Sequence, residues 1–276
     1  MPELPEAETI ARDLRKEVLG RRVIEIQVVH PDLLGQGLEP AGLRSALTGK
    51  EITGVGRRGK NLVLTFDEST ILRINLGMTG RLIVSDSPRA SEFRHLGVRF
   101  DLDDGRSLLY DDIRRFGRID LHDEESWTEW EGSLGVEPLS DEFTDQLLYS
   151  LTQRSRSPIR NWLLDQRRIA GIGNIYAVEA LWHAEIHPAR PARSLTREEV
   201  SALRDALQLV LRESIEARGT TISDYRDSSG ESGGYSAQLQ VYGREGDPCP
   251  RCRTPVERII LSNRSAFFCP KCQKET

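Results

Sequence analysis

The sequence predicts an α+β protein in which a strand-rich N-terminal part is followed by a helical part and a short tail that carries all four cysteines. Two observations favour this fold class. Short segments of alternating apolar and polar residues fill much of the region between residues 23 and 121, as is typical of strands. From about residue 140 to residue 218, apolar residues recur at helical spacing. The chain has 276 residues, 38% of them apolar, and is long enough for two domains of about 150 residues each.

The first predicted element is a helix near the start of the sequence. Pro5 suits the first helical position, and Glu6 and Glu8 are favourable in the first turn. Gly20 is a stop signal. Five apolar residues between these signals lie at helical spacing and predict the buried face, namely Ala7, Ile10, Ala11, Leu14 and Val18.

Seven short segments after this helix predict strands, and turn signals separate them at intervals typical of a β-sandwich. They are residues 23–29, 61–66, 70–76, 81–84, 95–102, 107–110 and 117–121. Helical periodicity returns in residues 163–164, 175–181 and 200–215. We therefore predict a β-sandwich domain at 1–135, a helical domain at 136–240 and a cysteine-bearing domain at 241–276, with the acidic stretch that ends near Pro138 as a linker.

The charges are segregated along the chain, so the net charge of −5 is a poor guide to its partners. Residues 119–145 contain ten acids and no Lys or Arg, which leaves a net positive charge on the rest. Residues 153–168 hold five Arg against one Asp, and residues 244–276 hold seven basic against four acidic residues. This distribution is compatible with a polyanionic partner.

The composition excludes several classes of protein. With 29% charged residues and 38% apolar residues, the chain is neither disordered nor collagenous. No apolar run approaches the roughly 20 residues that span a bilayer, so we expect no membrane partner. The first residues carry acids where a signal peptide would carry basic residues, and we expect the protein to be cytoplasmic.

The four cysteines form two C-x-x-C pairs in the last 28 residues, Cys249 with Cys252 and Cys269 with Cys272. Two such pairs provide four thiolates, which fits a tetrahedral structural Zn²⁺ site that leaves no position open for substrate. The alternatives are two disulfides or free thiols, and both are less expected in a cytoplasmic chain in which every cysteine belongs to such a pair. Arg264 lies between the pairs, either as a nucleic-acid contact or as a solvated surface charge.

Eight blocks of sequence, in order along the chain, carry a resemblance to a known family. They are MPELPEAET at 1–9, GRRGKNL at 56–62, LGMTGRL at 76–82, DIRRFGR at 112–118, GVEPLSDEF at 135–143, LLDQRRIAGIGNIYAVEALW at 163–182, VYGREGDPC at 241–249 and CPKCQ at 269–273. Together they resemble the bacterial formamidopyrimidine-DNA glycosylases of the Fpg/Nei family, and the resemblance runs from end to end.

The resemblance implies a bifunctional DNA glycosylase and AP lyase of base excision repair. Such an enzyme excises oxidised purines, 8-oxoguanine opposite cytosine and formamidopyrimidines, from double-stranded DNA. The implied architecture is a catalytic N-terminal β-sandwich with its helix, a helical domain with a helix–two-turn–helix, and a C-terminal zinc ribbon that holds one structural Zn²⁺. We expect a monomer that works at the bacterial nucleoid.

The resemblance also implies the catalytic residues. Removal of Met1 would make Pro2 the N-terminal residue, whose secondary amine attacks the sugar C1′ and expels the damaged base as an iminium forms. Glu3 would be the proton donor to the deoxyribose ring oxygen, with Glu6 in support. Lys60 and Arg264 would contact phosphates and donate protons in the β- and δ-elimination steps, respectively. Without the resemblance, Pro2 would be an ordinary chain start, Glu3 would compensate the partial positive charge at the N-terminus of the helix, and Lys60 would be a solvated turn residue.

Further residues match the family's DNA contacts. Met78 would fill the space left by the everted nucleotide, Phe116 would wedge into the base stack and Arg114 would pair with the orphaned base. Without the family, Met78 and Phe116 are better explained as core residues. The other implied DNA contacts are His95, Asn174 and Tyr242.

The glycine-rich turn before Asn174 resembles the helix–two-turn–helix, in which backbone amides approach a phosphate. Residues 219–234 resemble the loop that closes over the everted base, and the alternative is a flexible linker. The amides that would recognise the oxidised base belong to Ile222, Ser223, Asp224 and Tyr225.

Two residues depart from the family pattern. Asn75 stands where the family usually has a His that contacts phosphate, so this contact is in doubt. Arg160 stands where Lys is common, which keeps the charge but changes the geometry.

Two other functions stay open at this point. An enzyme of the endonuclease VIII type prefers oxidised pyrimidines, but that group typically begins MPEGPE, whereas this chain begins MPELPE. A non-catalytic zinc-ribbon DNA-binding protein is the other alternative, and the presence of Pro2, Glu3 and Lys60 argues against it.

Overall fold

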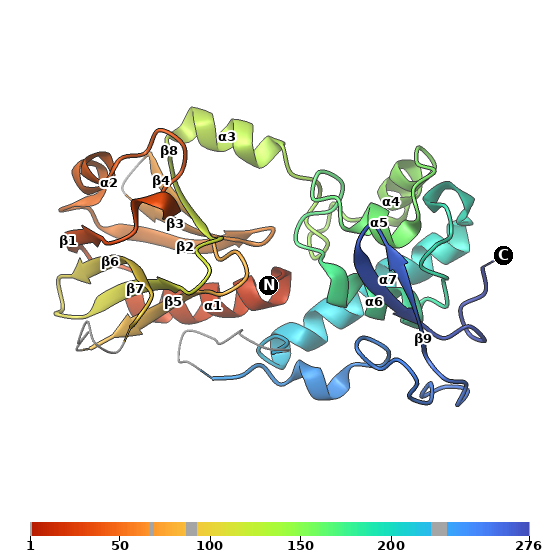
Figure 1. Cartoon of the computed structure of the whole chain (residues 1–276). Helices are drawn as coiled ribbons and strands as arrows, with labels where there is room; N and C mark the ends of the chain where they lie inside the picture. The colour runs from red at the N-terminus through yellow and green to blue at the C-terminus, as the bar shows by residue number, and fades with distance from the viewer. Residues whose placement is uncertain (1, 67–68, 87–92, 222–230, 276) are drawn as a thin grey trace. The chain divides into compact units, whose positions relative to one another are not determined.

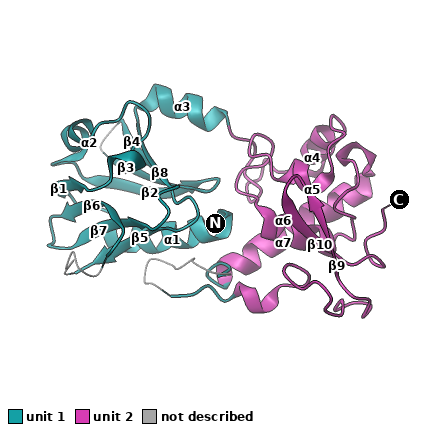
Figure 2. Ribbon diagram, viewed as in Figure 1, with its two compact units in different colours: residues 1–133, 217–234 teal, residues 134–216, 235–276 magenta. Residues whose placement is uncertain are grey.

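The computed structural model describes residues 2–66, 69–86, 93–221 and 231–275. The chain forms two compact units, which are coloured separately in Figure 2. The first unit comprises Met1–Ser133 and Ala217–Gly234, and the second comprises Leu134–Glu216 and Tyr235–Thr276. The predicted division into three domains stays a prediction.

The first unit is a β-sandwich with one long helix, as expected (Figure 1). One antiparallel sheet has the order β1-β6-β7-β5 and the other has the order β2-β3-β4-β8. The strands are β1 Val23–Val28, β2 Ile52–Arg58, β3 Asn61–Phe66, β4 Thr70–Asn75, β5 Gly80–Ser85, β6 Leu96–Leu102, β7 Ser107–Asp112 and β8 Arg118–His122. The helical elements are α1 Leu4–Val18, η1 Pro31–Leu33, α2 Pro40–Leu47 and α3 Glu124–Gly132.

Helix α1 begins where the sequence signals predict it. Pro5 lies in its first turn, and Glu3 and Glu6 form a capping box, so the first backbone amides find partners without a preceding turn of helix. The five predicted apolar residues are all buried in a core that the helix shares with both sheets. Burial of this face fixes the helix start against the sandwich.

Besides the three-residue η1, three elements of this unit were not predicted. Strand β2 reads ITGVGRR, in which two glycines and two arginines hide the alternation that marks a strand. Helix α2, Pro40–Leu47, is only eight residues long. The acidic stretch predicted as a linker instead contains α3, which Asp123 caps by accepting a hydrogen bond from the backbone N–H of Ser126 at 2.9 Å.

The second unit is helical and ends in a two-stranded hairpin. Its helical elements are α4 Asp145–Thr152, α5 Ile159–Leu163, α6 Asn174–His183, η2 Ala192–Ser194, α7 Arg197–Glu216 and η3 Tyr235–Gln238, and its strands are β9 Glu257–Leu261 and β10 Arg264–Phe268. Helix α6 is buried on nearly every side, and Tyr176 on it shares a 2.6 Å hydrogen bond with Ser214 on α7. None of the described helices is long and apolar enough to span a membrane.

Candidate active site

Pro2 and Glu3 lie buried at the N-terminal end of α1, where the predicted chemistry is located. Glu3 is 4% exposed, and its backbone N–H donates to the Glu6 carboxylate at 2.8 Å. This hydrogen bond is half of the capping box. Because the first backbone amides of a helix need acceptors, the helix start brings the carboxyl groups of Glu3 and Glu6 close to Pro2. The start of the helix therefore places acids next to Pro2, the predicted amine nucleophile.

Glu6 has a second partner that is distant in sequence. Its other carboxylate oxygen accepts a hydrogen bond from the backbone N–H of Thr220 at 2.7 Å, in a buried setting. Thr220 lies two residues before the predicted base-recognition residues 222–225, which lie outside the described residues. The described base of this segment is tied together by Gly233, whose N–H donates to Thr221 Oγ1 at 2.9 Å. Glu6 therefore joins the N-terminal end of α1 to Thr220.

Polar contacts hold α1 against β2. Arg57 on β2 donates to Glu8 at 3.0 Å, and Arg15 donates to the carbonyl oxygen of Val55 at 2.7 Å. Burial alone would raise the pKa of Glu8, but hydrogen bonds from Arg12 and Arg57 outweigh it and leave this pKa below its ordinary value. The helix is thus attached to the strand that leads into the turn of Lys60.

Lys60 lies in the two-residue turn between β2 and β3. Gly59 precedes it with a φ of +57°, the left-handed conformation that such a tight hairpin needs at its first position. A two-residue turn has few alternative conformations, so the backbone of Lys60 is well fixed.

Met78, Arg114 and Phe116 come together on the surface of the first unit. Arg114 Nη1 lies 3.2 Å from Met78 Sδ, and its guanidinium carbon lies 4.5 Å from the centre of the Phe116 ring. Met78 is 40% exposed and Phe116 is 58% exposed, so the alternative that both are core residues is wrong. Exposed apolar side chains around an arginine need a reason other than packing.

His95 is exposed just before β6. Its backbone N–H donates to the Asp111 carboxylate at 3.1 Å, and its carbonyl oxygen accepts from the N–H of Asp112 at 3.1 Å. These contacts fix its backbone beside the end of β7.

Asn75, the first departure from the family pattern, is used inside the protein. Its amide Nδ2 donates to Asn61 Oδ1 at 3.0 Å, and its Oδ1 accepts from the N–H of Gly77 at 3.0 Å. The side chain thus links β3 to the turn that carries Met78. Both ends of the amide are engaged in this support.

Arg160, the second departure, is also internal. It is 1% exposed and donates to the carbonyl oxygens of Leu261 at 3.0 Å and Ser265 at 3.2 Å. Asn174, at the start of α6, donates to the same Ser265 oxygen at 3.0 Å. Arg160 and Asn174 therefore attach the β9–β10 hairpin to the helices of the second unit.

Arg264 is exposed at the start of β10 and lies beside this junction. It lines a cavity of about 320 Å³ together with Arg160. The pKa of Arg160 lies below its ordinary value because of burial and, to a smaller extent, repulsion by the charge of Arg264. A phosphate would relieve that repulsion.

Glu179 is a functional candidate that the sequence reasoning missed. It is fully buried on α6, and its carboxylate accepts backbone hydrogen bonds from Gln240, Val241 and Tyr242 at 2.8, 3.0 and 2.7 Å. Burial raises its pKa despite these donors. The signal was an acid inside the apolar run IYAVEALW. Glu179 fixes the backbone of Tyr242, the predicted phosphate contact.

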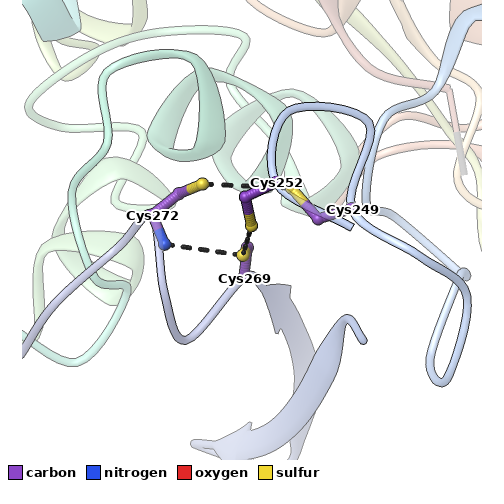
Figure 3. A group of neighbouring side chains, drawn as sticks. All are labelled: Cys249, Cys252, Cys269 and Cys272. Atoms are coloured by element: carbon purple, nitrogen blue, oxygen red, sulfur yellow. Dashed lines mark hydrogen bonds between the residues drawn. The ribbon is translucent and has the colours of Figure 1, made fainter. Parts of the chain in front are cut away.

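The four cysteines form the expected cluster. Their sulfurs lie within 4.8 Å of one another and none forms a disulfide (Figure 3). The distances are 4.0 Å between Cys249 and Cys272 and 3.4 Å between Cys252 and Cys269. A tetrahedron with Zn–S bonds of about 2.3 Å separates sulfurs by about 3.8 Å, so the cluster fits one structural zinc ion and the disulfide alternative is wrong.

The first unit is a β-sandwich, and the second combines helices with a hairpin that ends at a four-cysteine cluster. Family models match all three parts: the formamidopyrimidine-DNA glycosylase N-terminal domain at residues 1–119, the formamidopyrimidine-DNA glycosylase H2TH domain at 134–226, and the zinc finger found in FPG and IleRS at 246–274. The chain belongs to the formamidopyrimidine-DNA glycosylase family.

Whole-chain comparisons agree with the family models. The chain is 44% identical to the formamidopyrimidine-DNA glycosylase of Chloroflexus aggregans, with 99% of this chain and 98% of that protein covered. It is similar to the Lactococcus lactis Fpg in complex with DNA that contains an abasic site, with a TM-score of 0.90, 33% identity and 99% coverage of both chains. It is also similar to MutM (FPG) from Thermus thermophilus, with a TM-score of 0.88, 40% identity and full coverage of both chains.

Proposed function

We propose that this protein is a bifunctional DNA glycosylase and AP lyase of base excision repair that acts on oxidised purines in double-stranded DNA. The observation that carries the proposal is the start of α1, where Pro2 is buried beside the carboxyl groups of Glu3 and Glu6. Removal of Met1 would turn the Pro2 nitrogen from an amide into a secondary amine, and such an amine beside acids is suited to attack on a sugar carbon.

Base removal begins with Pro2 as the N-terminal residue, after loss of Met1. The Pro2 nitrogen bonds to C1′ as the bond from C1′ to the damaged base breaks, and the proton that the nitrogen loses neutralises the departing base. Glu3 protonates the ring oxygen of the deoxyribose, and the opened sugar becomes a cationic iminium on Pro2. Glu6 holds the Glu3 backbone during this step through the 2.8 Å hydrogen bond.

Strand cleavage follows from the same iminium. The cation withdraws electrons and acidifies the C2′ hydrogens, so β-elimination and then δ-elimination release the flanking phosphates. Lys60 is suited to the first step because its turn belongs to the strand pair on which α1 packs. Arg264 is suited to a phosphate because of its exposure beside Arg160.

Damaged DNA must also be opened and gripped. Eversion of a nucleotide costs a few kcal/mol, which an apolar wedge in the base stack offsets. Phe116 is the wedge, Met78 fills the vacated space and Arg114 pairs with the orphaned base. Asn174, Tyr242 and His95 contact phosphates, and the amides of residues 222–225 recognise the oxidised base.

The zinc ion contributes no chemical step. When it is bound, it holds the ends of the β9–β10 hairpin, because all four of its coordination positions are taken by cysteine. The hairpin in turn presents Arg264 and is attached to the helices by Arg160. We place the enzyme in the cytoplasm at the nucleoid, as a monomer.

Borohydride trapping tests the proposal. The full-length protein, shown by intact mass to lack Met1, is incubated with a duplex that contains 8-oxoguanine opposite cytosine and is then reduced. We expect a covalent protein–DNA adduct, because reduction fixes the iminium. Absence of an adduct from correctly processed protein would overturn the mechanism, and faster trapping on an oxidised pyrimidine would indicate the endonuclease VIII type.

A further inference from the structure

The exposed trio of Met78, Arg114 and Phe116 is carried by two turns, one between β4 and β5 and one between β7 and β8. Turns at a surface are ordinarily the mobile parts of a sandwich. A wedge that must enter a base stack works best if it is already formed, since ordering it on DNA costs binding free energy. The question is what holds these turns.

The turns meet around the carboxylate of Asp112, which ends β7 and is completely buried. One oxygen, Oδ1, accepts from the Thr79 hydroxyl at 2.6 Å and from the Arg114 N–H at 3.2 Å. The other, Oδ2, accepts from the Gly117 N–H at 2.9 Å and from the Tyr110 hydroxyl at 3.3 Å. One side chain thus holds both ends of the Arg114–Phe116 turn and the residue after Met78.

A second set of contacts joins the same turns. Thr79 Oγ1 also accepts from the Arg114 N–H at 3.0 Å, so this hydroxyl connects the two turns directly. A Cβ on Gly77 would collide with the backbone of Phe116 and Gly117, and Gly77 has a φ of +58°. The backbones of the two turns are therefore in contact.

The tip of the second turn is strained. Arg115, between Arg114 and Phe116, has a φ of +53°, a conformation that non-glycine residues rarely adopt. Such a conformation persists only where the surroundings determine it. The two oxygens of Asp112 supply that constraint from either side of Arg115.

We propose that Asp112 is the positioning residue for DNA opening: its buried carboxylate locks the Met78 and Arg114–Phe116 turns into one preformed wedge. This inference rests on the proposed function of the trio and deepens it. Asp112 touches no DNA and acts through the residues it holds. The burial of Tyr110 and the negative charge of Asp112 raise the pKa of the Tyr110 hydroxyl, which keeps it a donor to this carboxylate.

The first test variant is Asp112→Asn. An amide has one acceptor oxygen, and its NH₂ group would take the place of the other carboxylate oxygen. That NH₂ group would face two other donors, either the Gly117 N–H and the Tyr110 hydroxyl or the Thr79 hydroxyl and the Arg114 N–H. We expect single-turnover excision of 8-oxoguanine opposite cytosine in a duplex to slow about ten- to a hundredfold, the effect of one unpaired buried donor. Cleavage of a single-stranded oligonucleotide with a preformed abasic site should stay at the wild-type rate, because it has no stack to open and no orphaned base.

Two further variants keep the test decisive. Thr79→Val serves if Asp112→Asn folds poorly. Valine has nearly the same shape as threonine and lacks only the hydroxyl, so this variant should show a smaller loss of duplex excision with unchanged single-strand cleavage. Asp101→Asn is the matched control, because this half-buried acid on β6 accepts from Arg99 and Ser107 and has no described hydrogen bond to either turn. Its duplex activity should equal that of the wild type.

A direct readout is the fluorescence of 2-aminopurine placed next to the lesion, which rises when the stack opens. Asp112→Asn should slow that rise. The proposal is overturned if the folded variant opens and excises duplex at the wild-type rate, or if duplex and single-strand activities fall together. Wild-type protein that fails to excise from duplex would instead refute the proposed function.

Discussion

The two units hold the residues that we propose to contact DNA by different physical means. In the first unit, the wedge turns are held by hydrogen bonds to a buried carboxylate, Asp112, and by backbone contact at Gly77. In the second unit, the hairpin that carries Arg264 is held at its ends by four cysteines and on its flank by Arg160.

The difference follows from the amount of core available to each part. The wedge turns grow out of a sandwich with a large apolar core, so a few hydrogen bonds are enough to fix them. The hairpin belongs to a small cluster centred on the cysteines and Trp182, and a segment of that size ordinarily needs a metal to fold. This difference predicts that base excision and DNA binding can be disrupted separately.

The largest effect should come from the nucleophile end of α1. Pro2→Gly should slow base excision severely, and Glu3→Gln should block it, by about a hundredfold or more, because the proton donor is lost. Single-turnover excision on lesion duplex measures both. Glu3→Gln should keep wild-type affinity for the lesion, since it leaves the wedge and the hairpin intact. Unchanged excision by either variant would contradict the proposed roles.

Loss of the zinc site should weaken DNA binding more than it slows base excision. Cys249→Ser should release the metal and weaken duplex binding by about ten- to a hundredfold, because the hairpin loses the ends that fix it. Metal content and DNA affinity, measured on the same sample, check this. Chelation of the wild-type protein should reproduce the loss and added zinc should reverse it. Normal affinity in a zinc-free sample would refute the dependence.

A smaller effect is expected at the flank of the hairpin. Arg160→Met should lower the free energy of unfolding by about 1–3 kcal/mol, because the carbonyl oxygens of Leu261 and Ser265 lose a buried, charged donor. Thermal denaturation and the rate of zinc release to a chelator measure it. Arg160→Lys, with one ammonium in place of the guanidinium fork, should fall between the wild type and Arg160→Met. If Met at this position releases zinc no faster than Arg, the flank contact is dispensable.

The smallest effect concerns the attachment of α1 to β2. Glu8→Gln should cost about 1 kcal/mol at neutral pH, since it removes the charge opposite Arg57. The pKa of Glu8 is lowered in the folded protein, so its contribution is present above its unfolded pKa and disappears as the pH falls through the folded value. The stability difference between variant and wild type, measured by denaturant unfolding, should therefore vanish in acid. A difference that persisted there would exclude an ionic origin.

Some elements could be predicted because their signals are local. The start of α1, its buried stripe and the pairing of the cysteines are set by neighbours within a few residues. Strand β2 was missed because its glycines and arginines interrupt the alternation of apolar and polar residues. Helix α3 was missed because its run of acids is typical of a linker.

The sequence by itself determined the order of the parts, the family, and the residue types suited to iminium chemistry and zinc. Only the tertiary structure decided what Asp112, Arg160, Glu179 and Asn75 do. Each of these polar side chains bonds to backbone or side-chain groups of another segment. A buried polar group must find partners wherever the fold brings them, and those partners follow from three-dimensional packing, which local spacing along the chain does not record.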